Sequence, residues 1–404
     1  DEDFETYGFE TIEISGDTIN TTDLIRRRWL DNDFYAANAN VNYKNNKIDF
    51  TGGAFYSYYT GDHYGEVIWA RYASNSEIRD RYYEGNGEKS EFTVFSKATY
   101  RFSEKWSVFG DLQGRFLNYN ISGITSDLEA LTVDEDYSFF NPKAGLTYKL
   151  NPSNQFYFSY GKAHREPSRN DYEQGIVTPE KLDDFELGWR FATEKAKVNT
   201  NIYYMNYKDQ LVLSGELNDV GAPLRTSSGK SYRLGLEVDA EIQLLKNLRT
   251  LPNIALSTNK NVDFVTSRDG DLVNLGNTNI SFSPSVVAGN MLEYSPIQNL
   301  QLGFLSKFVG EQYMGNIDSE ASKLDSYFVN DFNIVYTLDS LPWVKEVVFS
   351  ALVNNIFNVE YISNGYFYTY DDDFSNPGTV TTVEGAGYYP QATINFLVGA
   401  TVKF

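Results

Sequence analysis

The C-terminal stretch of the chain, residues 391–404, reads QATINFLVGATVKF. Every even-numbered position in it, from Ala392 to Phe404, is apolar. The odd-numbered positions are polar or small, with the exception of Leu397. Because successive side chains of a β-strand point to opposite faces, this stretch predicts a long strand with one apolar and one polar face.

The same alternation recurs along the chain. It is strong at 231–242 and 143–150, and weaker at 48–58, 92–102, 155–165 and 326–338. Soluble strands usually have about five or six residues. Several of these runs are longer and reach the roughly 9–11 tilted residues that a strand needs to cross a bilayer. No run approaches the 18 or so consecutive apolar residues of a transmembrane helix.

The pattern predicts fifteen strands with connections of two kinds. Short, turn-like connections occur at 45–47, 103–105, 151–154, 193–195 and 295–297, and they are rich in Asn, Ser and Pro. Long connections alternate with them, at 62–88, 121–138, 166–180, 213–228, 264–278, 314–325 and 359–389. The expected strands are 31–44, 48–61, 89–103, 106–120, 139–150, 155–165, 181–192, 197–212, 229–243, 253–263, 279–295, 300–313, 326–338, 345–358 and 390–404.

Short turns at one rim and long loops at the other are typical of outer-membrane proteins. The predicted fold class is therefore all-β, a transmembrane antiparallel up-and-down β-barrel. A large soluble β-sandwich would share the alternation, but it has no reason to sort its connections by length. A single-chain barrel has an even number of strands. The odd count predicts that residues 1–30 are the remnant of an extracellular loop and that 31–404 are the C-terminal part of a barrel. One missed strand would instead give a closed sixteen-strand pore.

Composition excludes several classes of function. The 404 residues contain no cysteine and only two histidines, so disulfides and Cys-based or His-rich metal sites are excluded. The net charge of −21 argues against a nucleic-acid partner, which would need basic clusters. A Ser-His-Asp set would need a spatial convergence that no motif here indicates. We therefore expect no enzymatic activity and no catalytic residues.

Several segments share their order and spacing with one known family. They are 22–30 (TDLIRRRWL), 141–146 (NPKAGL), 159–168 (SYGKAHREPS), Pro179-Glu180, 186–188 (ELG), and 352–358 (LVNNIFN) followed by Tyr361. Together they resemble the TonB-dependent outer-membrane receptors of Gram-negative bacteria. His164 and Glu166 stand where the common motif has an aromatic and a small residue. Phe404, the aromatic end of the last strand, resembles the outer-membrane assembly signal.

The resemblance implies a twenty-two-stranded barrel with an N-terminal plug, of which this chain would supply about fifteen strands. It implies the outer membrane as location, with the loops extracellular, and the uptake of a scarce nutrient chelate, most commonly a ferric siderophore. The implied partners are the plug and first strands of the same protein, the TonB-ExbB-ExbD energy complex, lipid and lipopolysaccharide, and in some members a surface lipoprotein. Cobalamin, haem and glycan uptake remain open, as do a passive sixteen-strand porin and a surface adhesin.

Ligand contacts are expected in the long loops, because Tyr, Trp and Arg dominate contact energy in recognition. Aromatic rings at strand ends are better explained as a girdle at the membrane interface. For the loop residues the competing explanation is packing within the loops, and for the histidines it is simple solvent exposure. The candidate ligand-binding residues are His63, Tyr64, Trp69, Arg71, Tyr72, His164, Arg165, Tyr366, Tyr368 and Tyr370.

One acidic run is a candidate metal site. Asp371, Asp372 and Asp373 lie together in the last long loop, and clustered carboxylates suit a hard cation such as calcium. A solvated acidic loop tip is the alternative. Apart from this possible calcium ion and the transported metal chelate, no cofactor is expected.

Overall fold

The computed structural model describes residues 2–218, 221–339 and 342–404. Antiparallel β-strands dominate it, which confirms the all-β prediction. Within the described residues, no helix has the length and apolar character needed to cross a membrane. The chain forms two compact units. Unit 1 comprises the residues up to Thr99 together with 111–142 and 166–177, and unit 2 comprises 100–110, 143–165 and the residues from Thr178 onward.

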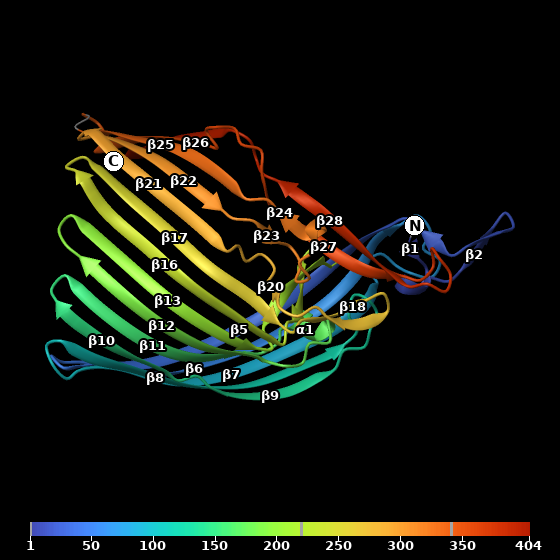
Figure 1. Ribbon diagram of the computed structural model, residues 1–404. Helices are drawn as coiled ribbons and strands as arrows, with labels where there is room; N and C mark the ends of the chain where they lie inside the picture. Colours follow the sequence, from blue (N-terminus) through green and yellow to red (C-terminus); the bar gives the residue numbers. More distant parts are fainter. Residues whose placement is uncertain (1, 219–220, 340–341) are drawn as a thin grey trace. The chain divides into compact units, whose positions relative to one another are not determined.

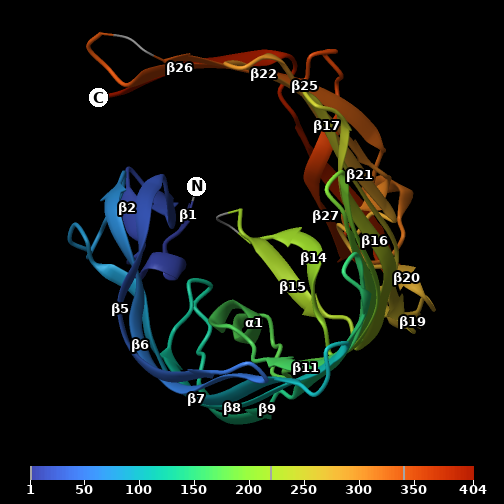
Figure 2. The same ribbon diagram turned by 90° about the vertical axis from the view of Figure 1, so that its left-hand side faces the viewer.

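Unit 1 is built on five long strands that follow one another in chain order (Figure 2). They are β5 (Leu24–Lys44), β6 (Ile48–Ala70), β7 (Arg81–Arg101), β8 (Trp106–Gly123) and β9 (Val133–Phe140). Small elements accompany them: β1 (Glu2–Asp3), η1 (Glu5–Tyr7), β2 (Ile12–Ile14), β3 (Asp17–Ile19), β4 (Thr21–Thr22) and the short helix α1 (Arg169–Glu173). Near the N-terminus, Phe4, Tyr7, Phe9 and Val67 form a small buried cluster.

Within unit 2 the strands also follow an up-and-down order (Figure 1). Its neighbouring strands, in order, are β10 (Lys143–Asn151), β11 (Asn154–Arg165), β12 (Glu180–Ala192), β13 (Ala196–Lys208), β16 (Lys230–Leu245), β17 (Leu248–Val262), β21 (Val286–Ile297), β22 (Leu300–Val309), β25 (Tyr327–Asp339), β26 (Glu346–Asn354) and β29 (Asn395–Lys403). The two-residue β20 (Thr278–Asn279) also pairs with β17.

The long connections of unit 2 fold into hairpins of their own. These are β14 (Leu211–Leu217) with β15 (Pro223–Ser227), β18 (Val265–Arg268) with β19 (Asp271–Asn274), β23 (Gln312–Tyr313) with β24 (Lys323–Leu324), and β27 (Ile362–Asp372) with β28 (Thr381–Pro390). A 3₁₀ turn, η2 (Glu320–Ser322), precedes β24. Residues 219–220, inside the predicted loop 213–228, lie outside the described residues.

Four of the five predicted short turns lie where the sequence places them, and side chains cap all four in the same way; at 151–154 the Asn151 side chain accepts from the Ser153 amide at 3.0 Å. Asn45 accepts backbone hydrogen bonds from Lys47 and Ile48 at 2.8 and 2.7 Å. The Ser103 hydroxyl accepts from the Trp106 amide at 3.0 Å, and the Thr193 hydroxyl from the Ala196 amide at 3.1 Å. Local side-chain acceptors of this kind favour turns over continued strand. The fourth, 151–154, joins β10 to β11.

The turn predicted at Ser295–Ile297 is wrong, because β21 runs through Ile297, which pairs with Leu300. The strand register shifts between Tyr294 and Ile297, and Pro296 lies in this irregularity. Proline is tolerated at such a bulge, where it has no ladder hydrogen bond to donate.

The predicted strand 139–150 is two strands, β9 and β10, separated by Asn141 and Pro142. The structure also corrects several boundaries. β5 begins at Leu24 rather than at residue 31, and β6 continues to Ala70 rather than ending at 61. The two strands stay paired from Lys44 opposite Asp49 to Leu24 opposite Ala70. The expected loops 1–30 and 62–88 are therefore partly strand.

One face of the unit 2 sheet carries an uncovered apolar row. Strand register places Phe158, Leu187, Ile202, Leu236 and Leu256 side by side on five successive strands. Phe158 is 49% exposed and Leu187 is 53% exposed. An uncovered apolar row of this extent is typical of strands that face lipid.

The residues one position away in each strand belong to the opposite face. Ser159 lies opposite Glu186, which lies opposite Tyr203. The Ser159 hydroxyl donates to the Glu186 carboxylate at 3.3 Å. This side of the sheet is therefore polar, as the alternation in the sequence predicts.

Candidate ligand-binding site

A first cavity lies in unit 1, at the end of the strands that is far from the short turns. Its volume is about 540 Å³, and it is lined by residues that include Asp62, His63, Tyr64, Arg81 and Glu84. Two of the candidate residues, His63 and Tyr64, are therefore cavity residues. Arg81 lies over the Tyr64 ring, with 3.7 Å from the guanidinium carbon to the ring centroid.

His63 is neutral at pH 7 in this environment. Burial, together with the nearby charge of Arg169, lowers the pKa of His63 to about 4. The imidazole can therefore both donate and accept a hydrogen bond at the cavity wall. Tyr64 also stacks on Trp29, with 6.2 Å between the ring centroids. The cavity wall thus combines one aromatic ring, that of Tyr64, with both signs of charge.

The other candidates on this stretch lie apart from the cavity lining. Arg71 forms an ion pair with Asp23 at 2.6 Å, and both side chains are exposed. The Tyr72 amide donates a hydrogen bond to the Thr22 hydroxyl at 2.9 Å. The Tyr72 ring packs against the buried Phe4 cluster, which fits packing within the loop. Trp69 is 50% exposed.

Tyr366, Tyr368 and Tyr370 form a ladder along one face of β27. Adjacent rings are stacked at centroid distances of 6.3 and 6.4 Å. Phe367, on the opposite face of the strand, is buried with Met314 and Leu324. The β27–β28 hairpin therefore has one face packed on its own unit and one tyrosine face, which is the arrangement expected of a contact surface.

The acidic run at the end of β27 ties two hairpins together. Asp371 accepts hydrogen bonds from Ser267, from the Gly270 amide and from Thr382, at 3.1, 3.0 and 2.6 Å. The hydrogen bond from Thr382, with those from Gly270 and Ser267, lowers the pKa of Asp371. Asp372 accepts from the amides of Phe374 and Ser375.

These contacts occupy the carboxylates as structural acceptors. No group of three or more acidic or histidine side chains with metal-binding geometry occurs in the part of the chain that the structure describes. The calcium site predicted at Asp371, Asp372 and Asp373 therefore gains no support from the geometry.

His164 and Arg165 end β11, where strand register places them opposite Lys181 and Glu180 of β12. They do not line the cavities described in this section. Phe404 follows β29 and is 82% exposed. The roles predicted for these three residues stay predictions.

A second cavity, of about 610 Å³, lies in unit 2 and was not expected from the sequence. Its lining includes Leu213 and Glu216 of β14 and Tyr389 of β28, together with Phe282, which precedes β21, and Tyr327 at the start of β25. The Tyr389 ring also contacts the Tyr366 ring at a centroid distance of 6.1 Å. The tyrosine ladder therefore adjoins this cavity.

Buried amides hold the wall of the second cavity. The Leu213 carbonyl oxygen accepts from the Asn316 side chain at 2.6 Å and from the Ser281 hydroxyl at 2.8 Å. Asn316 in turn accepts from the Ser281 amide at 3.0 Å and from the Asn261 side chain at 3.3 Å. Asn261 and Asn316 are 0% and 3% exposed. Segments far apart in the sequence are thus locked into one assembly.

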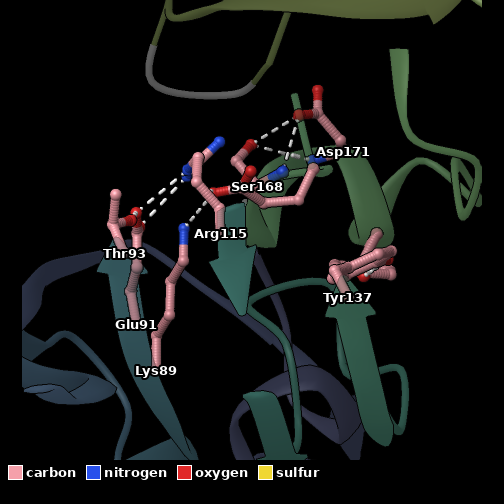
Figure 3. A network of polar contacts seen from close by, with 9 residues as sticks. Lys89, Glu91, Thr93, Arg115, Tyr137, Ser168 and Asp171 are labelled. Atoms are coloured by element: carbon pink, nitrogen blue, oxygen red, sulfur yellow. Dashed lines mark hydrogen bonds and ion pairs between the residues drawn. The ribbon is translucent and has the colours of Figure 1, made fainter. Parts of the chain in front are cut away.

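A network of buried charges ties β7 and β8 to the segment after β11 in unit 1 (Figure 3). Arg115 binds Glu91 through two hydrogen bonds of 2.9 and 3.1 Å, and it reaches Glu166 at 3.3 Å. Lys89 lies 2.5 Å from the same Glu166 oxygen. Burial alone would raise the pKa of Glu166, but the hydrogen bond from Lys89 and the charge of Arg115 bring it below its usual value.

The second oxygen of Glu166 is buried, and no partner for it occurs among the described residues. The sequence offered one signal for this network. Glu166 replaces the small residue of the motif that the segment resembles, and a carboxylate at such a position needs compensating cations. Lys89 on β7 and Arg115 on β8 could be assigned to Glu166 as partners only once the fold was known.

The family model described as "TonB dependent receptor-like, beta-barrel" matches residues 2–356 of the chain. The chain belongs to this family. The resemblance noted in the sequence is thereby confirmed. Its members are receptors rather than enzymes, in agreement with the prediction of no catalysis.

Two relatives of known name are similar to the chain. The ferrioxamine receptor of Yersinia enterocolitica is 23% identical over 320 residues, which cover 77% of this chain and 42% of that protein. The ferrichrome outer membrane transporter/phage receptor of Escherichia coli (strain K12) is 24% identical over 239 residues, covering 58% and 30%. The chain thus spans less than half the length of either relative.

The comparison with solved structures concerns the fold. The closed form of the ferric-catecholate import receptor Fiu from K12 E. coli superposes with a TM-score of 0.65 at 15% identity. The match covers 96% of this chain and 57% of Fiu. At this identity the comparison shows the fold alone, and the apolar row on unit 2 is consistent with a member of this fold.

Proposed function

We propose that the protein is an outer-membrane receptor that imports a ferric siderophore, with its hairpin loops extracellular. The observation that carries the proposal is the family match over residues 2–356, combined with two cavities at the loop ends of the strands, of which the one in unit 2 is lined by three aromatic side chains. The loop hairpins bind the chelate, and the TonB-ExbB-ExbD complex supplies the energy for its passage. The plug expected of the family would come from another part of the same protein.

The relatives support iron chelates as the cargo. By name, one is a ferrioxamine receptor and the other a ferrichrome transporter. The net charge of −21 favours an uncharged or cationic chelate over a strongly anionic one, because like charges repel a ligand on approach. Because the chain belongs to the TonB-dependent receptors, we do not retain the porin and adhesin alternatives.

The test is growth on single iron sources. A deletion strain and the same strain carrying the full-length gene are grown under iron limitation on ferrioxamine, ferrichrome, a ferric catecholate, ferric citrate or haem. We expect the deletion to abolish growth on one siderophore and the gene to restore it, but not in a host that lacks TonB. Equal growth of both strains on every source, or rescue without TonB, would contradict the proposal.

A further inference from the structure

The cavity in unit 2 holds a charge that its own walls do not balance. Glu216 of β14 is the one charged residue among the described residues that line it. No hydrogen bond or ion pair to its carboxylate is found in the described part of the chain. The other lining groups are neutral: amides such as Asn364 and Gln312, the hydroxyl of Ser363, aromatic rings and aliphatic side chains.

The surroundings of Glu216 are apolar enough to disfavour the ionised form of its carboxylate. Burial raises the pKa of Glu216, and no charge on another described residue contributes to the shift. A carboxylate that loses water without gaining a partner destabilises the protein in which it sits. The unpaired carboxylate therefore destabilises the empty receptor. A ligand that supplies the missing positive charge removes this free-energy cost.

Aromatic rings complete the surroundings of the carboxylate. Phe282, Tyr327 and Tyr389 line the same cavity. The faces of such rings attract ammonium groups, and the attraction grows when the site is desolvated. A cavity of about 610 Å³ is within the range of small-molecule sites. Size, rings and carboxylate therefore suit one chemical class, a small organic ligand that carries a protonated amine.

The cavity is also rigidly built. The Leu213 carbonyl that adjoins it is held by Asn316 and Ser281. Gly215 approaches β27 so closely that an added Cβ would lie 2.8 Å from the Phe367 carbonyl oxygen. Preorganised walls place Glu216 without a further ordering cost when a ligand enters.

From these observations we propose that Glu216 selects ferric chelates that carry a free protonated amine, by pairing with the ammonium group inside this cavity. The inference rests on the proposed function, because it assumes that iron chelates are the ligands. It adds what that function leaves open, namely a charge criterion for the cargo and the residue that applies it.

The test uses a matched pair of probes on the purified full-length receptor. One is a linear ferric tris-hydroxamate with one free primary amine, and the other is the same chelate after N-acetylation of that amine. The three hydroxamates neutralise the ferric ion, so only the amine differs in charge. We expect the wild-type receptor to bind the amine form about tenfold more tightly, the size of a charge-assisted hydrogen bond.

Glu216→Gln should remove this preference, with both probes binding like the acetylated form. Glu320→Gln is the matched control, because it removes the same charge from a side chain of unit 2 that is 83% exposed and does not line the cavity. It should keep the preference. An unchanged preference in Glu216→Gln would overturn the inference, as would equal loss in both variants.

The two proposals fail in different ways. If wild type binds both probes equally, the receptor function stands and the role of Glu216 is refuted. If it binds neither probe and the deletion strain grows normally on every iron source, the proposed function is refuted and the inference falls with it.

Discussion

Replacing Arg115 with methionine is expected to destabilise the folded protein by about 3–5 kcal/mol, the usual cost of removing one partner from a buried ion pair. Arg115 is the centre of the network, with bonds to both Glu91 and Glu166. Its side chain is 18% exposed, and those of Glu91 and Glu166 are 17% and 9% exposed. Without the guanidinium, two poorly hydrated carboxylates face each other, with Lys89 bound to only one of them.

The measurement is equilibrium unfolding in guanidinium chloride, followed by tryptophan fluorescence of the receptor in lipid vesicles. Arg101→Met is the control, because it removes an exposed arginine from the end of β7, the strand that carries Lys89 and Glu91, and it should stay within about 0.5 kcal/mol of wild type. Glu91→Gln in the Arg115→Met background should recover part of the loss. Equal stability of the two arginine variants would contradict a structural role for the network.

Gly215→Ala is expected to weaken chelate binding about fivefold to a hundredfold, because the backbone shift that relieves an overpacked Cβ costs roughly 1–3 kcal/mol. Gly215 has φ = +100°, and an added Cβ would meet the Phe367 and Met314 carbonyl oxygens at 2.8 and 3.0 Å. The β14–β15 hairpin must then move away from β27, which opens the second cavity. A smaller population of closed receptor lowers the apparent affinity in proportion.

The matched control is Gly229→Ala. Gly229 also has a positive φ, +64°, but an added Cβ there would have nothing within 4 Å. It should bind nearly as wild type does. Binding of iron-55-labelled chelate to whole cells measures the affinity, and limited proteolysis of β14–β15 reports the loosened hairpin without any ligand. If the two glycine variants bind the chelate equally well and are cleaved equally fast, the close approach of β14 to β27 does not contribute to ligand binding.

The membrane-spanning part of the fold could be predicted from the sequence because its physics is local. Alternation at 231–242, inside β16, and at 395–403, the part of the predicted strand 391–404 that forms β29, follows directly from one face in lipid and one in water. The turns at Asn45 and Thr193 were equally predictable, since their capping contacts involve residues at most three positions away. The bulge at Pro296 was not, because nothing local distinguishes a tolerated proline from a turn proline.

The loop hairpins and their cavities were beyond this reasoning. β27 is aromatic on both faces, with Tyr366 and Tyr368 on one side and buried Phe367 on the other, so no polar–apolar alternation marks it as a strand. The contacts that assemble the hairpins join residues such as Ser267 and Asp371, which are 104 positions apart. The tyrosines of the ladder were singled out by residue type, and their contact with a ligand stays a prediction, whereas Glu216 carried no signal until its surroundings were known.

The central claim is that one face of the strands contacts lipid and the other faces water. The 404 residues contain no cysteine, so Leu187→Cys and Glu186→Cys provide adjacent positions on opposite faces for spin labels. In lipid vesicles, the label at 187 should collide frequently with oxygen and rarely with a water-soluble nickel chelate, and the label at 186 should do the reverse. Equal access of the nickel chelate to both positions, or protection of the label at 187 from both reagents, would contradict the account.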